Sequence, residues 1–170
     1  MRALPRGDLT DRLVSHHLAR TRELLEAAAT LPPGALRRPL RPGFVATWFE
    51  GEEADAATMS ERLVFTLEVW VAAMAGLSAP EPRPETPLLD RFDAAARGFA
   101  RIARSVRDRG AWDDAFVDAL CEPPQSFTFG GVFAHVLEYG AIRREMLASV
   151  LGELGATVAA GDPILWESNR

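Results

Sequence analysis

The chain has 170 residues, of which 48% are hydrophobic and 25% charged, with a formal net charge of −5 and an isoelectric point near 5.3. This composition is typical of one globular domain over residues 1–170 and excludes a disordered chain. The acidic balance argues against nucleic-acid binding, because a phosphate-binding face needs a clustered basic excess.

The first helix is predicted over residues 8–31, where the apolar positions recur at helical spacing and Pro32-Pro33-Gly34 ends the pattern. Residues 32–57 then form a long connection that carries an acidic run, Glu50–Asp55. A connection of this length is uncommon inside a domain and is often functional. We expect it to lie across one end of the helices.

Thr58 and Glu61 have the spacing of a capping box, which predicts the start of a second helix that ends at Gly76. The proline-rich stretch 78–87 is a stiff connector. A third helix is predicted over 87–109, with Gly110 as its C-terminal cap. Residues 111–127 show no regular pattern and are expected to return the chain across the helices.

The fourth helix is predicted from Ser126–Thr128 to Leu154, followed by a tail, Asp162–Trp166, whose tryptophan is expected to pack back on the helices. No segment shows strand alternation over more than a few residues. Four amphipathic helices without strands must bury their apolar faces against one another. The sequence therefore predicts an all-α fold, a four-helix bundle with a long connection between helices 1 and 2.

Cys121 is the only cysteine, so no disulfide forms within the chain, and a lone thiol is typical of a reducing cytoplasm. The N-terminal segment lacks the apolar core of a secretory signal, and the longest apolar runs, such as 69–77, are too short to cross a bilayer. We expect a cytoplasmic protein that does not enter the membrane.

The three histidines are the first candidates for chemistry. His17 lies on the apolar face of the first helix, where a hydrogen-bonded core histidine is the commoner role than a ligand. His135 precedes Glu138 by three positions, a ligand spacing, but di-iron bundles need such pairs from several helices and only one is present. No phosphate loop or hydrolase motif is found.

Two stretches give the chain a family resemblance. Residues 128–144 (TFGGVFAHVLEYGAIRR), followed by 151–155 (LGELG) and 162–166 (DPILW), resemble the last helix and tail of DinB-like proteins. Residues 62–70 (RLVFTLEVW) resemble the second-helix motif of the same family. The resemblance implies a four-helix bundle and a homodimer. Members with known activities include transferases and isomerases that use a thiol cofactor and a divalent metal.

In metal-binding members of the family, the resemblance places one histidine ligand on the second helix and two on the fourth. The matching positions in this chain are Arg62, Tyr139 and Arg143, and His135 lies one turn before the last two. A guanidinium stays protonated and has no lone pair for a metal. The resemblance therefore implies a degenerate site with no metal and no cofactor.

Two interpretations of this site stay open. Arg62, Tyr139 and Arg143, with His17, His135 and Glu68 nearby, would form a pocket for a small anionic or amphipathic ligand between helices 1, 2 and 4. Alternatively, each arginine pairs with a local acid and cross-links the helices, the candidate acids being Glu61, Glu68, Glu138 and Glu145.

The sequence thus favours a DinB-like protein that binds a small ligand without a metal, or a dimeric interaction module. The alternative function is a divalent-metal-dependent transferase or isomerase with a thiol cofactor. That alternative would need His17, His135 and Glu138 to rebuild a metal site.

Overall fold

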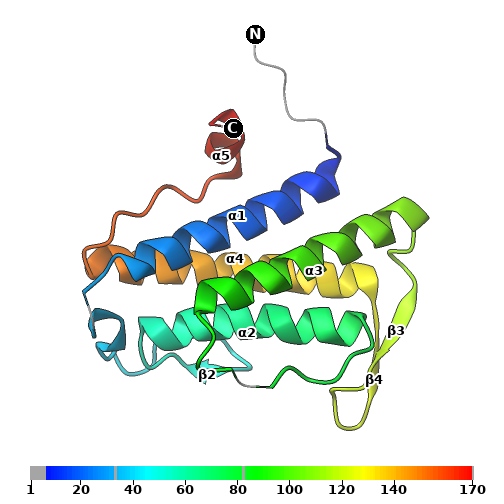
Figure 1. Ribbon diagram of the computed structural model, residues 1–170, viewed down its shortest axis with the longest axis horizontal. Helices are drawn as coiled ribbons and strands as arrows, with labels where there is room; N and C mark the ends of the chain where they lie inside the picture. The colour runs from blue at the N-terminus through cyan, green and yellow to red at the C-terminus, as the bar shows by residue number, and fades with distance from the viewer. Residues whose placement is uncertain (1–6, 33, 82, 170) are drawn as a thin grey trace.

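Four long helices form most of the computed structural model, which describes residues 7–32, 34–81 and 83–169. They run side by side along the long axis of the molecule (Figure 1). Their bounds are α1 Leu9–Ala29, α2 Ala56–Met74, α3 Leu88–Arg109 and α4 Phe129–Glu153. The prediction of an all-α class is confirmed, because strands are confined to two short hairpins.

The helix ends follow from local side-chain chemistry. Asp8 accepts a hydrogen bond from the Asp11 amide at 2.9 Å and so caps α1. Thr128 accepts one from the Gly131 amide at 3.1 Å and caps α4. Gly110 ends α3 in the left-handed conformation with φ 63°, which favours glycine.

The predicted capping box of α2 is wrong. The helix begins at Ala56, and Asp55 is its cap, because the Asp55 carboxylate accepts a hydrogen bond from the Thr58 amide at 2.7 Å. Glu61 is turned instead toward α3, where it bonds Arg91 at 2.6 Å. An aspartate is at least as good a cap as the threonine three positions on, and it captures the same helix terminus.

The helices pack in pairs, with α1 and α2 each contacting both α3 and α4. Two apolar clusters fill the space between them. One contains the fully buried Phe92 and Phe99 of α3, and the other contains Leu24, Met59 and Leu147 from three different helices. Burial of these faces supplies the main stabilisation of the arrangement.

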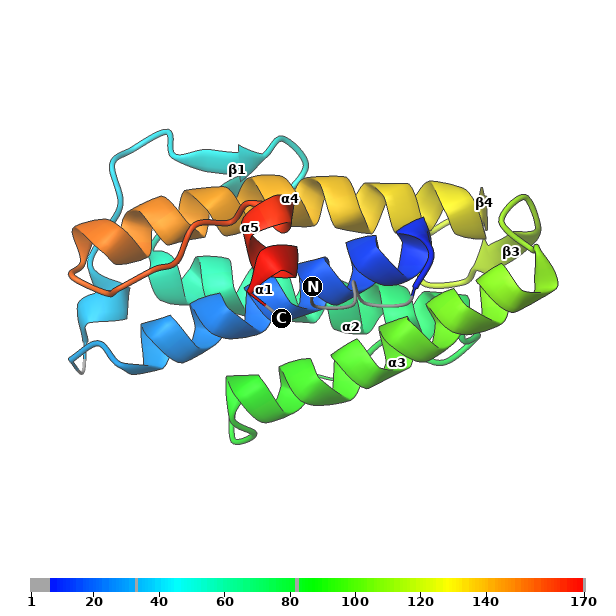
Figure 2. The same ribbon diagram turned by 90° about the horizontal axis from the view of Figure 1, so that it is seen from above.

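The long connection between α1 and α2 has structure of its own. It forms a 3₁₀ turn, η1 (Ala35–Arg37), and an antiparallel hairpin of β1 (Val45–Thr47) and β2 (Gly51–Glu52). The expectation that it lies across one end of the helices is wrong. β1 packs against α4, and Figure 2 shows the hairpin alongside that helix.

The stretch 111–127, expected to be irregular, contains a second hairpin of β3 (Ala115–Asp118) and β4 (Gln125–Thr128). The tail ends in a short helix, α5 (Pro163–Ser168). Trp166 meets the ring of His16 edge-on, 5.3 Å between ring centroids. The tryptophan therefore packs back on α1 as predicted. Within the described ranges, no helix combines the length and apolar character that a bilayer span requires.

Candidate functional site

Arg62 and Arg143, expected to face one site from α2 and α4, meet at a carboxylate that the sequence did not single out. Arg62 donates to Glu53 Oε2 at 3.0 Å and to the Glu52 carbonyl at 3.1 Å. The Arg143 Nε lies 3.6 Å from the other oxygen of Glu53. The Glu53 side chain has no exposed surface. One buried carboxylate of the hairpin segment thus joins the second and fourth helices.

A second acid completes this arrangement, which we call the charge cluster: Glu50, Glu53, Arg62 and Arg143. Glu50 contacts the Arg143 guanidinium. Its other contacts are the hydroxyls of Thr47 at 2.7 Å and Thr66 at 3.2 Å, and Thr47 also accepts from Arg143 at 3.1 Å.

The environment of the charge cluster sets its ionisation. Burial raises the pKa of Glu53, and the nearby Arg62 opposes that rise. Burial lowers the pKa of Arg143 to about 10, so the guanidinium is still protonated at neutral pH. Two guanidiniums therefore face two carboxylates in a partly desolvated environment. Such a cluster cross-links helices, and its two guanidiniums have no lone pair for a metal ion and repel it by their charge.

Tyr139 and His135 lie beside the charge cluster in an aromatic group. The His135 ring is 4.7 Å from that of Tyr139 and 5.4 Å from that of Trp70, between centroids. Phe49 of the hairpin closes over both rings, at 5.7 Å from His135 and 5.1 Å from Tyr139. Burial lowers the pKa of His135, so the imidazole is neutral near pH 7.

His17 is buried, as its place on the apolar face of α1 predicted. Burial and the neighbouring Arg144 hold its pKa well below the usual range. Its Nδ1 is in hydrogen-bond contact with the Arg144 guanidinium, which makes Nδ1 the acceptor. Gly140 permits this approach, because a Cβ there would lie only 2.6 Å from His17 Cε1.

The cavity between these side chains is small. His17, His135, Tyr139 and Arg143 do line one space, but its volume is about 20 Å³, room for one water molecule. Both predicted arginines are occupied by protein carboxylates. In this conformation the geometry corresponds to the cross-link interpretation, and the acids are Glu50 and Glu53 rather than Glu61, Glu68, Glu138 or Glu145.

Glu68 lies away from this cavity, contrary to expectation. It is buried and forms a two-point pair with Arg91 of α3, at 3.2 and 2.6 Å. Arg83 adds a third bond at 2.7 Å. Six residues along a helix turn the side chain by about 120° from Arg62, so the two cannot share one direction. Glu68 therefore connects α2 with α3.

The alternative ligand set of His17, His135 and Glu138 does not assemble either. His17 contacts Arg144, His135 meets the ring of Trp70 edge-on, and Glu138 is exposed to solvent. In the part of the chain that the structure describes, no three His, Cys, Asp or Glu side chains group closely enough to hold a metal ion.

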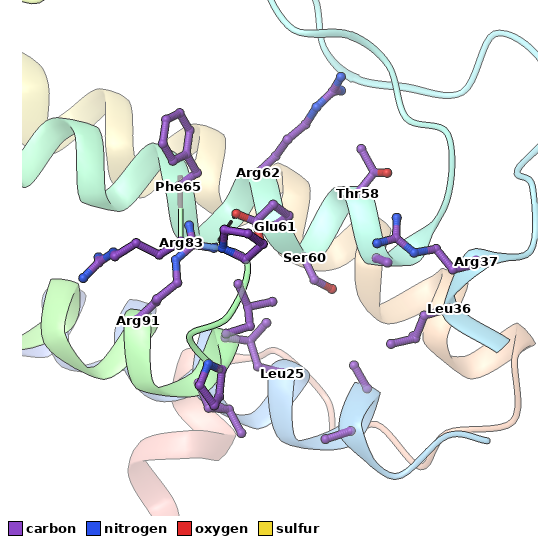
Figure 3. Close-up of a pocket in the computed structure, with 17 residues that line it drawn as sticks. Leu25, Leu36, Arg37, Thr58, Ser60, Glu61, Arg62, Phe65, Arg83 and Arg91 are labelled. Atoms are coloured by element: carbon purple, nitrogen blue, oxygen red, sulfur yellow. Dashed lines mark hydrogen bonds and ion pairs between the residues drawn. The ribbon is translucent and has the colours of Figure 1, made fainter. Parts of the chain in front are cut away.

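A larger hollow lies elsewhere, between α1, α2, η1 and the start of α3. This groove has a volume of about 890 Å³, within the range of small-molecule sites. Its walls are largely apolar (Figure 3), formed by Leu25, Ala28, Ala29, Leu36, Ala57, Phe65, Pro84, Pro87, Leu88 and Leu89. It borders helices 1, 2 and 3, whereas the sequence pointed to helices 1, 2 and 4.

Among the described residues, four arginines border the groove, and one of them, Arg37, is loosely held enough to meet a ligand. Arg62, Arg83 and Arg91 each have a carboxylate oxygen at 3.0 Å or less, and in Figure 3 the Arg62 guanidinium points away from the hollow. Arg37 differs, because its nearest carboxylate, on Asp55, is 3.6 Å away and its side chain is 71% exposed. The groove therefore offers one available cation at the η1 end.

No local pattern predicts this groove, because its wall combines residues from four separate segments of the chain. The acidic run Glu50–Asp55 was the one sequence signal for the two acids of the charge cluster. A scan against protein-family models and searches of curated proteins and of solved structures each return no match for this chain.

Proposed function

We propose that this chain is a DinB-like four-helix bundle whose metal position has become the charge cluster, and that it binds a small amphipathic anion in the groove. The ligand is a carboxylate on an apolar body. One observation carries the proposal: a hollow of about 890 Å³ with apolar walls and, among the residues that the structure describes along it, one loosely held guanidinium, Arg37, at one end.

The apolar wall of the groove is the evidence that the ligand has an apolar body. A groove of this size buries most of a ligand of drug-like size, and the burial of apolar surface contributes about 25 cal/mol per Å². Phe65 is 37% exposed on this wall. An aliphatic or aromatic body would cover it.

Arg37 is the evidence that the ligand carries a negative charge. Its planar fork can donate two parallel hydrogen bonds to a carboxylate. The 3.6 Å contact with Asp55 is long, so a ligand can compete for the guanidinium. The same competition is harder at Arg91, where Glu68 and Glu61 bind at 2.6 Å. The ligand's head therefore sits at the η1 end.

Fluorescence of 8-anilinonaphthalene-1-sulfonate, itself an amphipathic anion, tests the proposal. We expect the dye to bind, decanoate to displace it, and decanol to displace it at least tenfold less well. Filling the groove with Ala29→Trp should abolish dye binding. Arg37→Met should bring decanoate down to the level of decanol.

Arg38→Met is the matched control, because Arg38 is the exposed neighbour of Arg37 and does not line the groove. It should behave as the wild type. Equal displacement by decanoate and decanol in the wild type would contradict a charged head, and unchanged dye binding in Ala29→Trp would contradict the groove.

The metal-dependent alternative has its own measurement. Elemental analysis of protein purified without chelator should find no stoichiometric zinc, nickel or manganese. A bound equivalent of any of them would overturn the degenerate site. The homodimer implied by the DinB-like resemblance is likewise part of this proposal, and light scattering measures it.

A further inference from the structure

Two of the buried arginines lack the close carboxylate partners that a buried guanidinium needs to be stable. Among the described residues the buried arginines are Arg20, Arg91, Arg143 and Arg144. Arg91 and Arg143 each contact two carboxylates. Arg20 and Arg144 do not, although they are 3% and 4% exposed. A buried guanidinium is stable only when paired and hydrogen-bonded.

The partners of Arg20 and Arg144 are few. Arg20 has one carboxylate, on exposed Glu23, at 3.5 Å. Arg144 forms no ion pair with the described residues: its Nη1 contacts the neutral His17, and the exposed Glu145 acts on it only at longer range. The Nε–H groups of both arginines are buried with no acceptor among the residues described.

The two guanidiniums act on the same region between α1 and α4. Each lowers the pKa of His16, as does burial, which has the larger effect. Burial lowers the pKa of Arg144 to about 10, and Arg20 contributes to the fall. The Arg144 guanidinium therefore remains charged at neutral pH. The space between these helices holds two guanidiniums, and the acids that act on it, Glu23 and Glu145, are exposed to solvent.

The segment between α4 and α5 covers this region. The Gly161 carbonyl is 3.1 Å from His16 Nε2. A Cβ at Gly161 would lie 3.3 Å from Arg20 Nε and would overlap the carboxylate of Glu145, an exposed acid that a phosphate would displace from this place. Figure 2 shows the segment returning along α4 and α5 sitting over α1. Residues 155–162 have no regular secondary structure and are mostly exposed, and Ala156 and Val158 are the residues of this segment that pack against the second apolar cluster.

We propose that Arg20 and Arg144 form a binding site for a phosphate group between α1 and α4, beneath residues 155–162. A phosphate carries a charge of about −1.5 to −2 and several acceptor oxygens. It can therefore neutralise both guanidiniums and accept from both Nε–H groups, which a single carboxylate does less completely. His17 fixes Nη1 of Arg144, so the guanidinium is held in place before the phosphate arrives.

The site is independent of the groove. It uses neither Arg37 nor the apolar walls, and it lies on the α1–α4 side of the molecule under the tail. Failure of the dye experiment would leave this inference standing, and the reverse also holds.

Thermal unfolding in inorganic phosphate, against chloride at equal ionic strength, tests the site. We expect the wild-type melting temperature to rise with phosphate and to saturate, because a ligand that binds only the folded state stabilises it. Arg20→Met and Arg144→Met should weaken phosphate binding at least tenfold and remove the rise.

Arg143→Met is the matched control, since Arg143 is equally buried but already paired. It should lower the melting temperature and keep the phosphate response. If a methionine variant does not fold, Arg20→Lys and Arg144→Lys keep the charge but lose the forked donors, and isothermal titration with phosphate should show the same weakening. The inference is overturned if the wild type responds equally to phosphate and chloride, or if the Arg20 and Arg144 variants respond as Arg143→Met does.

A parallel arm uses glycerol phosphate to identify the source of the phosphate group. A comparable rise in melting temperature supports a site for a phosphorylated small molecule, whose body would displace the tail. A response to inorganic phosphate alone supports a closed site for the free ion.

Discussion

Glu53→Gln isolates the part of the charge cluster that joins the second and fourth helices. The change keeps the size of the side chain and removes its charge. Glu53 has no exposed surface and contacts Arg62 at 3.0 Å and Arg143 at 3.6 Å. Removing one partner of a buried pair costs about 3–5 kcal/mol.

Three features of the structure place the cost below that range. Arg62 is 30% exposed and can turn to water. Arg143 keeps its contact with Glu50. Burial already raises the pKa of Glu53, so the native carboxylate bears a desolvation cost that the amide avoids. We expect a loss of about 2–3 kcal/mol in the free energy of unfolding, or about 4–12 °C in melting temperature for a chain of this length.

Urea unfolding at pH 7, followed by circular dichroism, measures this loss. Glu52→Gln is the control, because it removes the same charge from the same hairpin at an exposed position, where an effect within about 0.5 kcal/mol is expected. If Glu53→Gln costs no more than Glu52→Gln, the charge cluster does not stabilise the fold. A double variant with Arg143→Met should lose less than the sum of the two single losses.

Two further predictions concern the contact between α1 and α4. Gly140→Ala should lower the free energy of unfolding by about 1–3 kcal/mol, because the new Cβ would lie 2.6 Å from His17 Cε1. Gly152→Ala on the same helix meets nothing within 4 Å and should raise the free energy of unfolding by about 0.5–1 kcal/mol. Equal effects of the two changes in urea unfolding would contradict the close approach. The second concerns pH. Because the pKa of His17 is lowered in the folded state, the unfolded chain binds the proton first, and stability should fall as pH drops below about 6.5, by up to 1.4 kcal/mol per pH unit. His17→Gln should flatten that dependence between pH 7.5 and 5.5, and an unchanged slope would show that His17 is not its source.

The helices were predictable because their signals are local. Periodic apolar residues and terminal caps such as Gly110 lie within a few positions of the structure they specify. The burial of His17 followed from the same periodicity. The two hairpins were not predicted, since strands of two to four residues are too short to show alternation.

The charge cluster was only half predictable. The sequence identified Arg62, Tyr139 and Arg143 as neighbours of one place, and the last two do line one cavity. The sequence did not show which acids pair with these arginines. Glu50 and Glu53 belong to the connection between α1 and α2, and no local sequence pattern predicts the path of that connection. Glu68 was misplaced for a simpler reason: its position on the helix turns it toward Arg91.

The residues of the charge cluster lie far apart in the sequence, and this separation affects the rate at which the protein unfolds. Arg143 and Thr47 are 96 positions apart, so their contact closes a loop of more than half the chain. Closing a long loop costs chain entropy, and we expect this contact to form after the folding transition state. Interactions that are absent from the transition state act mainly on the unfolding rate. The hairpin that carries Glu50 and Glu53 therefore governs how long the folded molecule persists more than how quickly it forms.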